Sequence, residues 1–287
     1  SLLYLLVIFL KKKFTSVKKL EIPIICVGNI YIGGTGKTPV SIFLANEIKK
    51  LKKNPVIIRK YYKNHHDEYE LIKNNTEDLI LNRNRLHGLQ KAEKLNYDIA
   101  ILDDGLQDYK IKKNFNIACF NENQLAGNGL LLPSGPLRES LSALKNIDVI
   151  IINGEKNEVF EEKLLSFNKN LDIYYSSYKP INIQEFKGKK LLALAGIGNP
   201  ENFFQLLKKN DLIIEKKFIF PDHYNFSINE IKKIVNIAEN ENYQIIMTEK
   251  DYFKIKHFNL NKINYLKISL KLNNQERLIN RIKKLYA

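Results

Sequence analysis

The sequence predicts an α/β fold built on a doubly wound, mostly parallel sheet. Short apolar runs alternate along the chain with segments of helical periodicity, which is the pattern of successive β-α-β units. The apolar runs are nearly continuous, as expected of parallel strands that are buried on both faces. With 287 residues, 44% of them hydrophobic, the chain is long enough for a large core and for one or two domains.

The elements follow one another in regular order. The apolar runs predict strands at residues 22–27, 55–59, 98–102, 116–120, 148–152, 190–195, 213–218, 243–247 and 263–268. Helical periodicity predicts helices at residues 38–53, 84–94, 158–167, 200–209, 227–240 and 273–286. Asn199 can cap the fourth of these helices, and Pro200 suits its first position. The polar stretch 175–189 lacks periodicity, and we interpret it as a link between two lobes.

A glycine-rich loop joins the first predicted strand to the first predicted helix. It ends in Gly36-Lys37-Thr38, the ending of a phosphate-binding loop, although Tyr31 stands where that pattern has its first glycine. Its glycines let backbone amides close on an anion at the helix N-terminus. Lys37 is expected to reach the β- and γ-phosphates, and Thr38 to ligate Mg²⁺. The alternative is a glycine-rich turn without a ligand. The predicted nucleotide-binding residues are Tyr31, Ile32, Gly33, Gly34, Thr35, Gly36, Lys37 and Thr38.

Two adjacent acids follow another predicted strand and are candidate metal ligands. Asp103 and Asp104 end an apolar run, and ligands of open α/β sheets gather at the carboxyl ends of strands. Together with the Thr38 hydroxyl they form the oxygen set expected for magnesium. Arg138 and Glu139 are further candidates to face this crevice, and we include Glu139 in the metal site. The alternatives are a turn for the two aspartates and a helix N-terminus for Arg138 and Glu139. We therefore predict a P-loop NTPase-like fold.

The charge balance predicts an anionic partner. The chain carries 46 Lys+Arg against 31 Asp+Glu, a formal net charge of +15, which favours a nucleic acid, a phosphorylated substrate or a membrane surface. No lysine run is interleaved with aromatic residues in the way of a nucleic-acid module. Cys26 and Cys119 lie in apolar runs without metal spacing, so we expect core residues in a reducing compartment.

Residues 1–20 predict a helix at a membrane interface. The apolar run 2–10 is too short to span a bilayer, which takes about 20 residues. Lys11, Lys12 and Lys13 follow the run, whereas a secretory signal carries its charge before it. An apolar body with a cationic end suits the membrane surface. The alternative is a helix docked on the core. Because the sequence opens on Ser1 without an initiator methionine, we allow for residues upstream.

Six segments of this chain occur in an order that resembles the tetraacyldisaccharide 4'-kinase family, which phosphorylates a lipid A precursor in Gram-negative bacteria. The resemblance covers nearly the whole chain from about Leu2. The segments are VGNIYIGGTGKTPV (27–40), ILDDGLQ (101–107), LLPSGPLRESL (131–141), LAGIGNPENFF (194–204), FPDHYNFS (220–227) and TEKDYFKI (248–255).

The resemblance implies an ATP- and Mg²⁺-dependent kinase of two lobes. Residues 21–178 would form the kinase core, and residues 179–287 a smaller α/β lobe that closes over the cleft, with a last helix that can pack on the core. The acceptor would be the 4'-hydroxyl of a tetraacylated glucosamine disaccharide 1-phosphate. The enzyme would associate peripherally with the cytoplasmic face of the inner membrane and bind no nucleic acid. The alternatives are a soluble P-loop enzyme for a small substrate and a nucleic-acid-binding ATPase.

The resemblance also implies a catalytic set of Asp67, His223 and Lys37. Asp67 matches the acid of the family's GDE motif, and His223 matches a histidine of its DHH or DHY motif. An aspartate that holds a histidine, or the reverse, supplies an oriented base for a sugar hydroxyl. We expect lobe closure to assemble the pair. Without the resemblance, Asp67 is a candidate helix cap and His223 a loop residue.

The chain departs from the family pattern near both motifs. Lys60 and Lys63 stand where the family has glycines, and His66 replaces the glycine before Asp67. Asp108 replaces the histidine that follows the family's DDGFQ segment, which puts any role of that side chain in doubt. The remaining histidines show no constellation and are expected at the surface; they are His65, His87 and His257.

Overall fold

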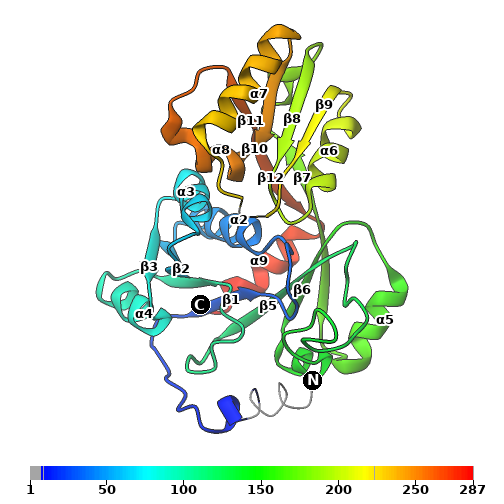
Figure 1. The fold of residues 1–287 in the computed structure, drawn as a ribbon. Coiled ribbons are helices and arrows are strands. Elements are labelled where there is room, and N and C mark those ends of the chain that lie inside the picture. The colour runs from blue at the N-terminus through cyan, green and yellow to red at the C-terminus, as the bar shows by residue number, and fades with distance from the viewer. Residues whose placement is uncertain (1–7, 9, 223, 287) are drawn as a thin grey trace. The chain divides into compact units, whose positions relative to one another are not determined.

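The fold is known from a computed structural model, which describes residues 8, 10–222 and 224–286 (Figure 1). By its internal contacts the chain divides into two units. Unit 1 comprises Ser1–Tyr61, Thr76–Ser177 and Leu270–Ala287, and unit 2 comprises Tyr62–Asn75 and Tyr178–Ser269. Compared with the expected division after residue 178, one internal segment therefore belongs to the second unit and the C-terminal segment to the first.

Unit 1 is built on an eight-stranded sheet with the order β12-β7-β6-β5-β1-β4-β2-β3. The central strand β1 pairs in parallel with β4 on one side and β5 on the other. The strands that follow β1 in the sequence lie on both sides of it, with β2, β3 and β4 on one side and β5, β6 and β7 on the other. The loop that follows β1 therefore lies at a topological switch point, where α/β sheets bind ligands. The prediction of a mostly parallel α/β fold is confirmed. The strands are β1 Ile24–Gly28, β2 Pro55–Lys60, β3 Leu79–Asn82, β4 Ile99–Asp103, β5 Phe115–Asn121, β6 Val149–Asn153, β7 Asp172–Pro180 and β12 Ile268–Leu272.

Helices α2 (Lys37–Lys50), α4 (Arg85–Lys94), α5 (Glu158–Phe167) and α9 (Gln275–Lys283) complete unit 1 with the 3₁₀ turn η1 (Leu141–Asn146). Helix α2 follows the glycine-rich loop directly and buries its apolar face against the sheet. Helix α9 buries Leu278, Ile279 and Ile282, and Arg277 and Arg281 both pair with Asp172 at the start of β7.

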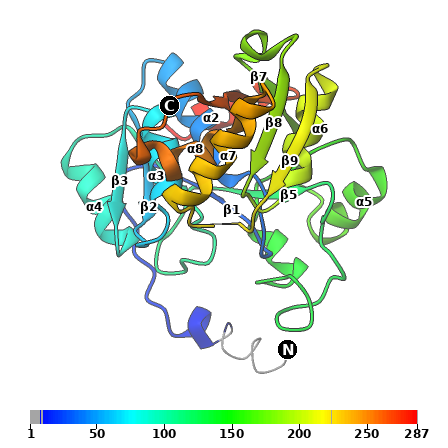
Figure 2. The ribbon, with the colours of Figure 1, turned by 45° about the horizontal axis from the view of Figure 1, so that its top comes forward.

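Unit 2 holds a parallel four-stranded sheet with the order β11-β10-β8-β9. Alternate residues of β8 face two apolar clusters, one formed with α6 and the other with α7, and these helices lie on opposite sides of the sheet (Figure 2). The central strands β8 and β10 are therefore largely buried, whereas the edge strand β9 is largely exposed. The elements are β8 Lys190–Ala195, β9 Ile213–Ile219, β10 Gln244–Thr248, β11 Ile263–Leu266, α3 His66–Asn75, α6 Pro200–Lys209, α7 Ile228–Asn240, α8 Glu249–Ile255, η2 Ile183–Phe186 and η3 Lys256–Phe258.

Two expected segments differ from the structure. The boundary between the units falls between Ser177 and Tyr178, so the stretch 175–189 does link them. It is not irregular throughout, because strand β7 runs through Pro180. Of the helix expected over residues 1–20, residues 1–7 and 9 lie outside the described part. Residues 10–13 are helical, but the following segment is extended and Lys18 forms a bridge with Ile111. No helix within the described residues is both long and apolar enough to cross a membrane.

Candidate active site

The glycine-rich loop leaves β1 and enters α2 through backbone that only glycine adopts readily. Gly33 has φ +137° and Gly36 has φ +80°, both in the region that a Cβ disfavours. Asn29, which follows β1, holds the loop from inside, because its Nδ2 donates to the Thr35 hydroxyl (3.3 Å) and to the Gly33 carbonyl (3.5 Å). The loop is thus a preformed turn at a helix N-terminus, where backbone amides favour an anion.

Tyr31, the departure from the usual loop pattern, is a packing residue. Its ring is fully buried against Phe120, and its hydroxyl accepts a hydrogen bond from the Asn121 amide (2.8 Å). Burial raises the pKa of this hydroxyl. The neighbouring Ile32 amide donates to the Pro136 carbonyl (2.9 Å). The side chain of Tyr31 therefore anchors the loop to β5 and does not face a ligand.

The buried carboxylate of Asp103 ends β4 beside the start of α2. It accepts hydrogen bonds from Thr38 (3.1 Å) and Ser41 (3.2 Å) and forms an ion pair with Arg59. Arg59 also donates to the Thr38 hydroxyl (3.0 Å). A buried carboxylate needs such compensation, because desolvation of an unpaired charge is costly. Arg59 and Ser41 were not identified from the sequence, although a charge at the end of the apolar strand β2 is a signal.

Three cations converge on Asp104. Lys37 Nζ lies 3.8 Å and Arg138 Nη1 3.4 Å from the Asp104 carboxylate, and Arg85 donates to the Asp104 carbonyl (2.6 Å). Burial alone raises the pKa of Asp104, but the surrounding positive charges outweigh this and hold it below its ordinary value. Asp108, which replaces the family histidine, lies 3.9 Å from Arg85. The surplus of positive charge in this corner suits a polyphosphate.

Glu139 is nearly buried and has both carboxylate oxygens engaged. Oε2 accepts from Lys12 (2.8 Å) and Oε1 from Gln107 (3.0 Å). Among the described residues, no group of three or more His, Cys, Asp or Glu side chains is arranged to hold a metal ion.

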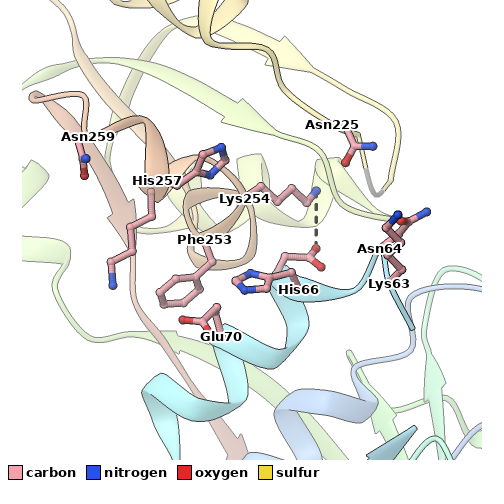
Figure 3. Close-up of a pocket in the computed structure, with 11 residues that line it drawn as sticks. Lys63, Asn64, His66, Glu70, Asn225, Phe253, Lys254, His257 and Asn259 are labelled. Atoms are coloured by element: carbon pink, nitrogen blue, oxygen red, sulfur yellow. Dashed lines mark ion pairs between the residues drawn. The ribbon is translucent and has the colours of Figure 1, made fainter. Parts of the chain in front are cut away.

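Asp67 lies in unit 2, in the first turn of α3, with its carboxylate between two lysines of α8. Lys250 Nζ is 3.8 Å and Lys254 Nζ 3.9 Å from Asp67 Oδ2, and the Lys254 pair is drawn in Figure 3. Lys250 also lies within 3.5 Å of Glu68 and 3.3 Å of Asp222. These lysines belong to the TEKDYFKI segment, to which sequence reasoning gave no role. Both distances to Asp67 exceed a direct hydrogen bond, so the two lysines act on Asp67 through their positive charge.

His223 lies outside the described residues, so its side chain is not placed. Its neighbours Asp222 and Tyr224 belong to unit 2, and Lys250 pairs with both Asp222 and Asp67. The segments around the two residues thus belong to one unit, and the approach of His223 to Asp67 stays a prediction.

A pocket of about 710 Å³ opens beside Asp67 within unit 2 (Figure 3). Its wall combines amine and amide donors with carboxylates, two imidazoles and one phenylalanine ring, a composition that suits a polar ligand. The lining residues are Lys63, Asn64, His66, Asp67, Glu70, Asn225, Phe253, Lys254, Lys256, His257 and Asn259. Of the histidines expected at the surface, His87 and His257 are exposed, and His65 is partly buried and bonded to Glu68 (2.9 Å).

Comparison with known proteins gives one consistent family. The profile of the tetraacyldisaccharide-1-P 4'-kinase family, LpxK, matches residues 1–287. A tetraacyldisaccharide 4'-kinase of Pelagibacter ubique is 40% identical over 278 residues, 96% of this chain and 87% of the relative. One of Haemophilus influenzae is 32% identical over 255 residues, 82% of this chain and 74% of the relative.

A solved structure shows the same fold. LpxK from Aquifex aeolicus, determined in complex with ATP, matches with a TM-score of 0.76 at 24% identity, over 100% of this chain and 97% of that one. The fold, the end-to-end family match and the relatives' identities agree with the motif order found in the sequence. The chain belongs to the tetraacyldisaccharide 4'-kinase family of phosphotransferases.

Proposed function

We propose that this chain transfers the γ-phosphate of ATP to the 4'-hydroxyl of a tetraacylated glucosamine disaccharide 1-phosphate, a step of lipid A biosynthesis. One observation carries the proposal: the GGTGKT loop opens α2 beside a corner of Lys37, Arg85 and Arg138, in a chain that the family profile matches from end to end. The acceptor is taken from the relatives' names, and the donor from the Aquifex LpxK, which was solved in complex with ATP.

In this proposal, the loop amides and Lys37 hold the β- and γ-phosphates, where positive charge stabilises the transferring group. The oxygens of Thr38, Asp103 and Asp104 are the hard donors that Mg²⁺ prefers. Mg²⁺ supplies neutralisation of the phosphate charge. Glu139 was also expected among the metal ligands. Its oxygens are engaged by Lys12 and Gln107, as those of Asp103 are by Thr38, Ser41 and Arg59, so we keep Glu139 as a fourth proposed ligand.

Asp67, together with His223, is proposed to accept the proton of the attacking sugar hydroxyl. Two nearby positive charges, Lys250 and Lys254, favour the ionised form of Asp67 that can accept a proton. The chemistry needs no strong base, because phosphoryl transfer relies mainly on positioning and electrostatic stabilisation.

The N-terminal segment is proposed to bring the enzyme to the cytoplasmic face of the inner membrane as a peripheral protein. Leu10 (41%), Phe14 (78%) and Val17 (57%) are exposed next to a run of lysines. Exposed apolar side chains beside cationic ones favour an anionic lipid surface. Membrane association would bring the enzyme to its acceptor, because the acyl chains of that acceptor hold it in the membrane.

ATP turnover measured with the acylated disaccharide, with RNA or DNA, and with neither tests the proposal. We expect phosphate transfer only with the disaccharide, and Lys37→Ala should abolish it while circular dichroism shows a folded chain. Stimulation by nucleic acid with a steep salt dependence would instead indicate a nucleic-acid-dependent ATPase. Turnover of a soluble small molecule, without the lipid acceptor, would indicate the soluble P-loop enzyme.

A further inference from the structure

Lys12, in the N-terminal segment, turns back onto the body of unit 1. Its Nζ donates to Glu139 Oε2 (2.8 Å) and lies 4.8 Å from the centre of the Tyr109 ring. The Glu139 side chain is only 6% exposed, whereas that of Lys12 is 42% exposed. A charge-assisted hydrogen bond to a buried carboxylate is stronger than an exposed ion pair. This contact therefore fixes Lys12 more firmly than a surface lysine.

The hydrogen bonds continue from Glu139 to the phosphate loop. Gln107 Nε2 donates both to Glu139 Oε1 (3.0 Å) and to the Asn29 carbonyl (2.8 Å). Asn29 is fully buried, and its own Nδ2 donates to Gly33 and Thr35 of the loop. A series of hydrogen bonds, each donated by a side chain, thus leads from Lys12 to the backbone of the loop that is proposed to bind the phosphates.

A second branch starts from the same place. The backbone amides of Arg138 and Glu139 both donate to the Ile30 carbonyl, at 2.7 and 3.2 Å. The Arg138 guanidinium reaches Asn29 Oδ1 and Asp104 Oδ1, both at 3.4 Å. A shift of Glu139 would therefore also move the backbone at Ile30 and the Arg138 guanidinium beside Asp104.

We infer that Lys12 is a positioning residue that couples the N-terminal segment to the phosphate loop through Glu139, Gln107 and Asn29. The inference rests on the proposed function, in which the loop binds the phosphates of ATP and the N-terminal segment binds the membrane surface. The segment that carries Lys12 also exposes Leu10 and Phe14, so a membrane that takes up these side chains also sets the place of Lys12. Nucleotide affinity then depends on the N-terminal segment, although that segment supplies no ligand to the nucleotide.

The test compares Lys12→Gln with Lys11→Gln in the full chain. Both changes remove one charge from the same run, and Lys11 is exposed. Binding of a non-hydrolysable ATP analogue with Mg²⁺ is measured by calorimetry without lipid, and binding to vesicles of anionic phospholipid by sedimentation. We expect Lys12→Gln to raise the Kd of the nucleotide about 5-fold or more, the lower end of typical site-to-site coupling. Lys11→Gln should leave that Kd unchanged. Both variants should lose vesicle binding equally.

Three further variants separate coupling from general damage. Lys12→Arg keeps the charge and should restore most of the affinity. Glu139→Gln should weaken nucleotide binding, and the double variant Lys12→Gln/Glu139→Gln should be no weaker than Glu139→Gln, as for residues that act as one unit. Gln107→Leu breaks the series beyond Glu139, and it should weaken nucleotide binding without changing vesicle binding. If Lys12→Gln does not fold, the nucleotide affinity of Gln107→Leu alone tests the inference.

Equal nucleotide affinity in Lys12→Gln and the unmodified chain would overturn the inference. So would additive losses at Lys12 and Glu139, or an unchanged Kd in Gln107→Leu. Tighter binding in Lys12→Gln would show that Lys12 obstructs the site instead of supporting it, which also contradicts the inference. An unmodified chain that binds no ATP analogue would contradict the proposed function itself, so the two failures are distinguishable.

Discussion

Arg59 and Asp103 form a buried ion pair in the floor of the candidate site, with their side chains 7% and 0% exposed. Removing one partner of such a pair leaves an uncompensated buried charge. We expect Arg59→Met to lower the free energy of unfolding by about 3–5 kcal/mol, measured by denaturant titration.

Lys156→Met is the control for Arg59, because Lys156 forms its ion pair with Glu158 at the exposed surface of unit 1. It should leave stability unchanged. A similar loss in the two variants would mean that the burial of the Arg59 pair has no energetic consequence.

The lysines beside Asp67 predict a coupled effect on turnover. Asp67→Asn should lower kcat by a factor within about 10²–10⁴, the range for loss of a general base. Lys250→Met should lower kcat by a smaller factor, because it removes one of the two positive charges beside Asp67. In an Asp67→Asn background Lys250→Met should cost nothing further, as for groups that act together.

Lys262→Met serves as the matched control for Lys250, because Lys262 pairs with Glu239 at the surface of the same unit. It should leave kcat unchanged in both backgrounds. Multiplicative losses for Asp67→Asn and Lys250→Met would show that Lys250 does not act through Asp67.

Single side chains differ in how far the sequence could place them. Lys37 and Thr38 could be placed because the loop pattern is local, and Asp103 because it ends an apolar strand. Arg59 and Ser41 could not be placed, because their partner Asp103 lies far along the chain and only the folded sheet brings them together. The ion pair between Lys12 and Glu139 spans 127 positions, and no sequence pattern of either segment predicts it.

Helix α7 predicts a pH-dependent contribution to stability. Ser227 and Glu230 form a reciprocal cap, and Tyr224 also donates to Glu230 (2.5 Å). These hydrogen bonds, the one from Ser227 foremost, lower the pKa of Glu230 to about 2. A carboxyl whose pKa falls on folding stabilises the fold above its unfolded pKa, about 4.3 for glutamate, and loses this contribution as the pH falls towards 2.

The difference in unfolding free energy between the unmodified chain and Glu230→Gln should therefore be constant near neutral pH and shrink between about pH 4 and pH 2. Ser227→Ala should destabilise the helix by about 1 kcal/mol, the usual cost of a lost cap. Hydrogen exchange of the α7 amides measures both effects. A Glu230→Gln difference that persists at pH 2 would show that the carboxylate charge is not its source.

Strands and helices with continuous apolar runs or clear capping residues could be predicted from the sequence. Elements that mix polar and apolar residues without a clear period could not. Strands such as β1, β4 and β6 are almost wholly buried and read as continuous apolar runs. In strand β7 only Tyr174 and Ser176 are buried, and two serines are adjacent, so its composition resembled a loop. Helix α3 is short, largely polar and has two buried apolar residues, Tyr69 and Ile72, which is too weak a periodicity to detect.

The division of the entire chain into units could not be read from local patterns either. The segment Tyr62–Asn75 belongs to unit 2 although unit 1 residues flank it on both sides. Its place depends on contacts such as those of Asn74 and Asn75 with Glu249 (3.3 and 3.2 Å). Likewise, the C-terminal helix belongs to unit 1, where it buries three apolar side chains and pairs with Asp172. Such contacts join segments that are far apart in the sequence, and local motifs do not predict them.

The net charge of +15 and the exposed N-terminal segment together predict how the chain meets a lipid surface. Binding should be strong on anionic vesicles and weak on zwitterionic ones. It should fall as salt rises from 0.1 to 1 M, because the screening length shortens from about 10 to about 3 Å. Phe14→Ser should weaken binding about 10-fold, since part of the apolar free energy of a phenylalanine is lost.

Val159 offers the matched control for Phe14, because it is an equally exposed apolar residue of unit 1, at 79% against 78%, but lies in α5 and not in the N-terminal segment. Val159→Ser should leave vesicle binding unchanged, and neither variant should alter nucleotide affinity in solution. Equal losses in the two variants would assign binding to general surface hydrophobicity. Loss in neither, with full salt sensitivity, would assign it to charge alone, and the apolar face of the N-terminal segment would then have no part in membrane contact.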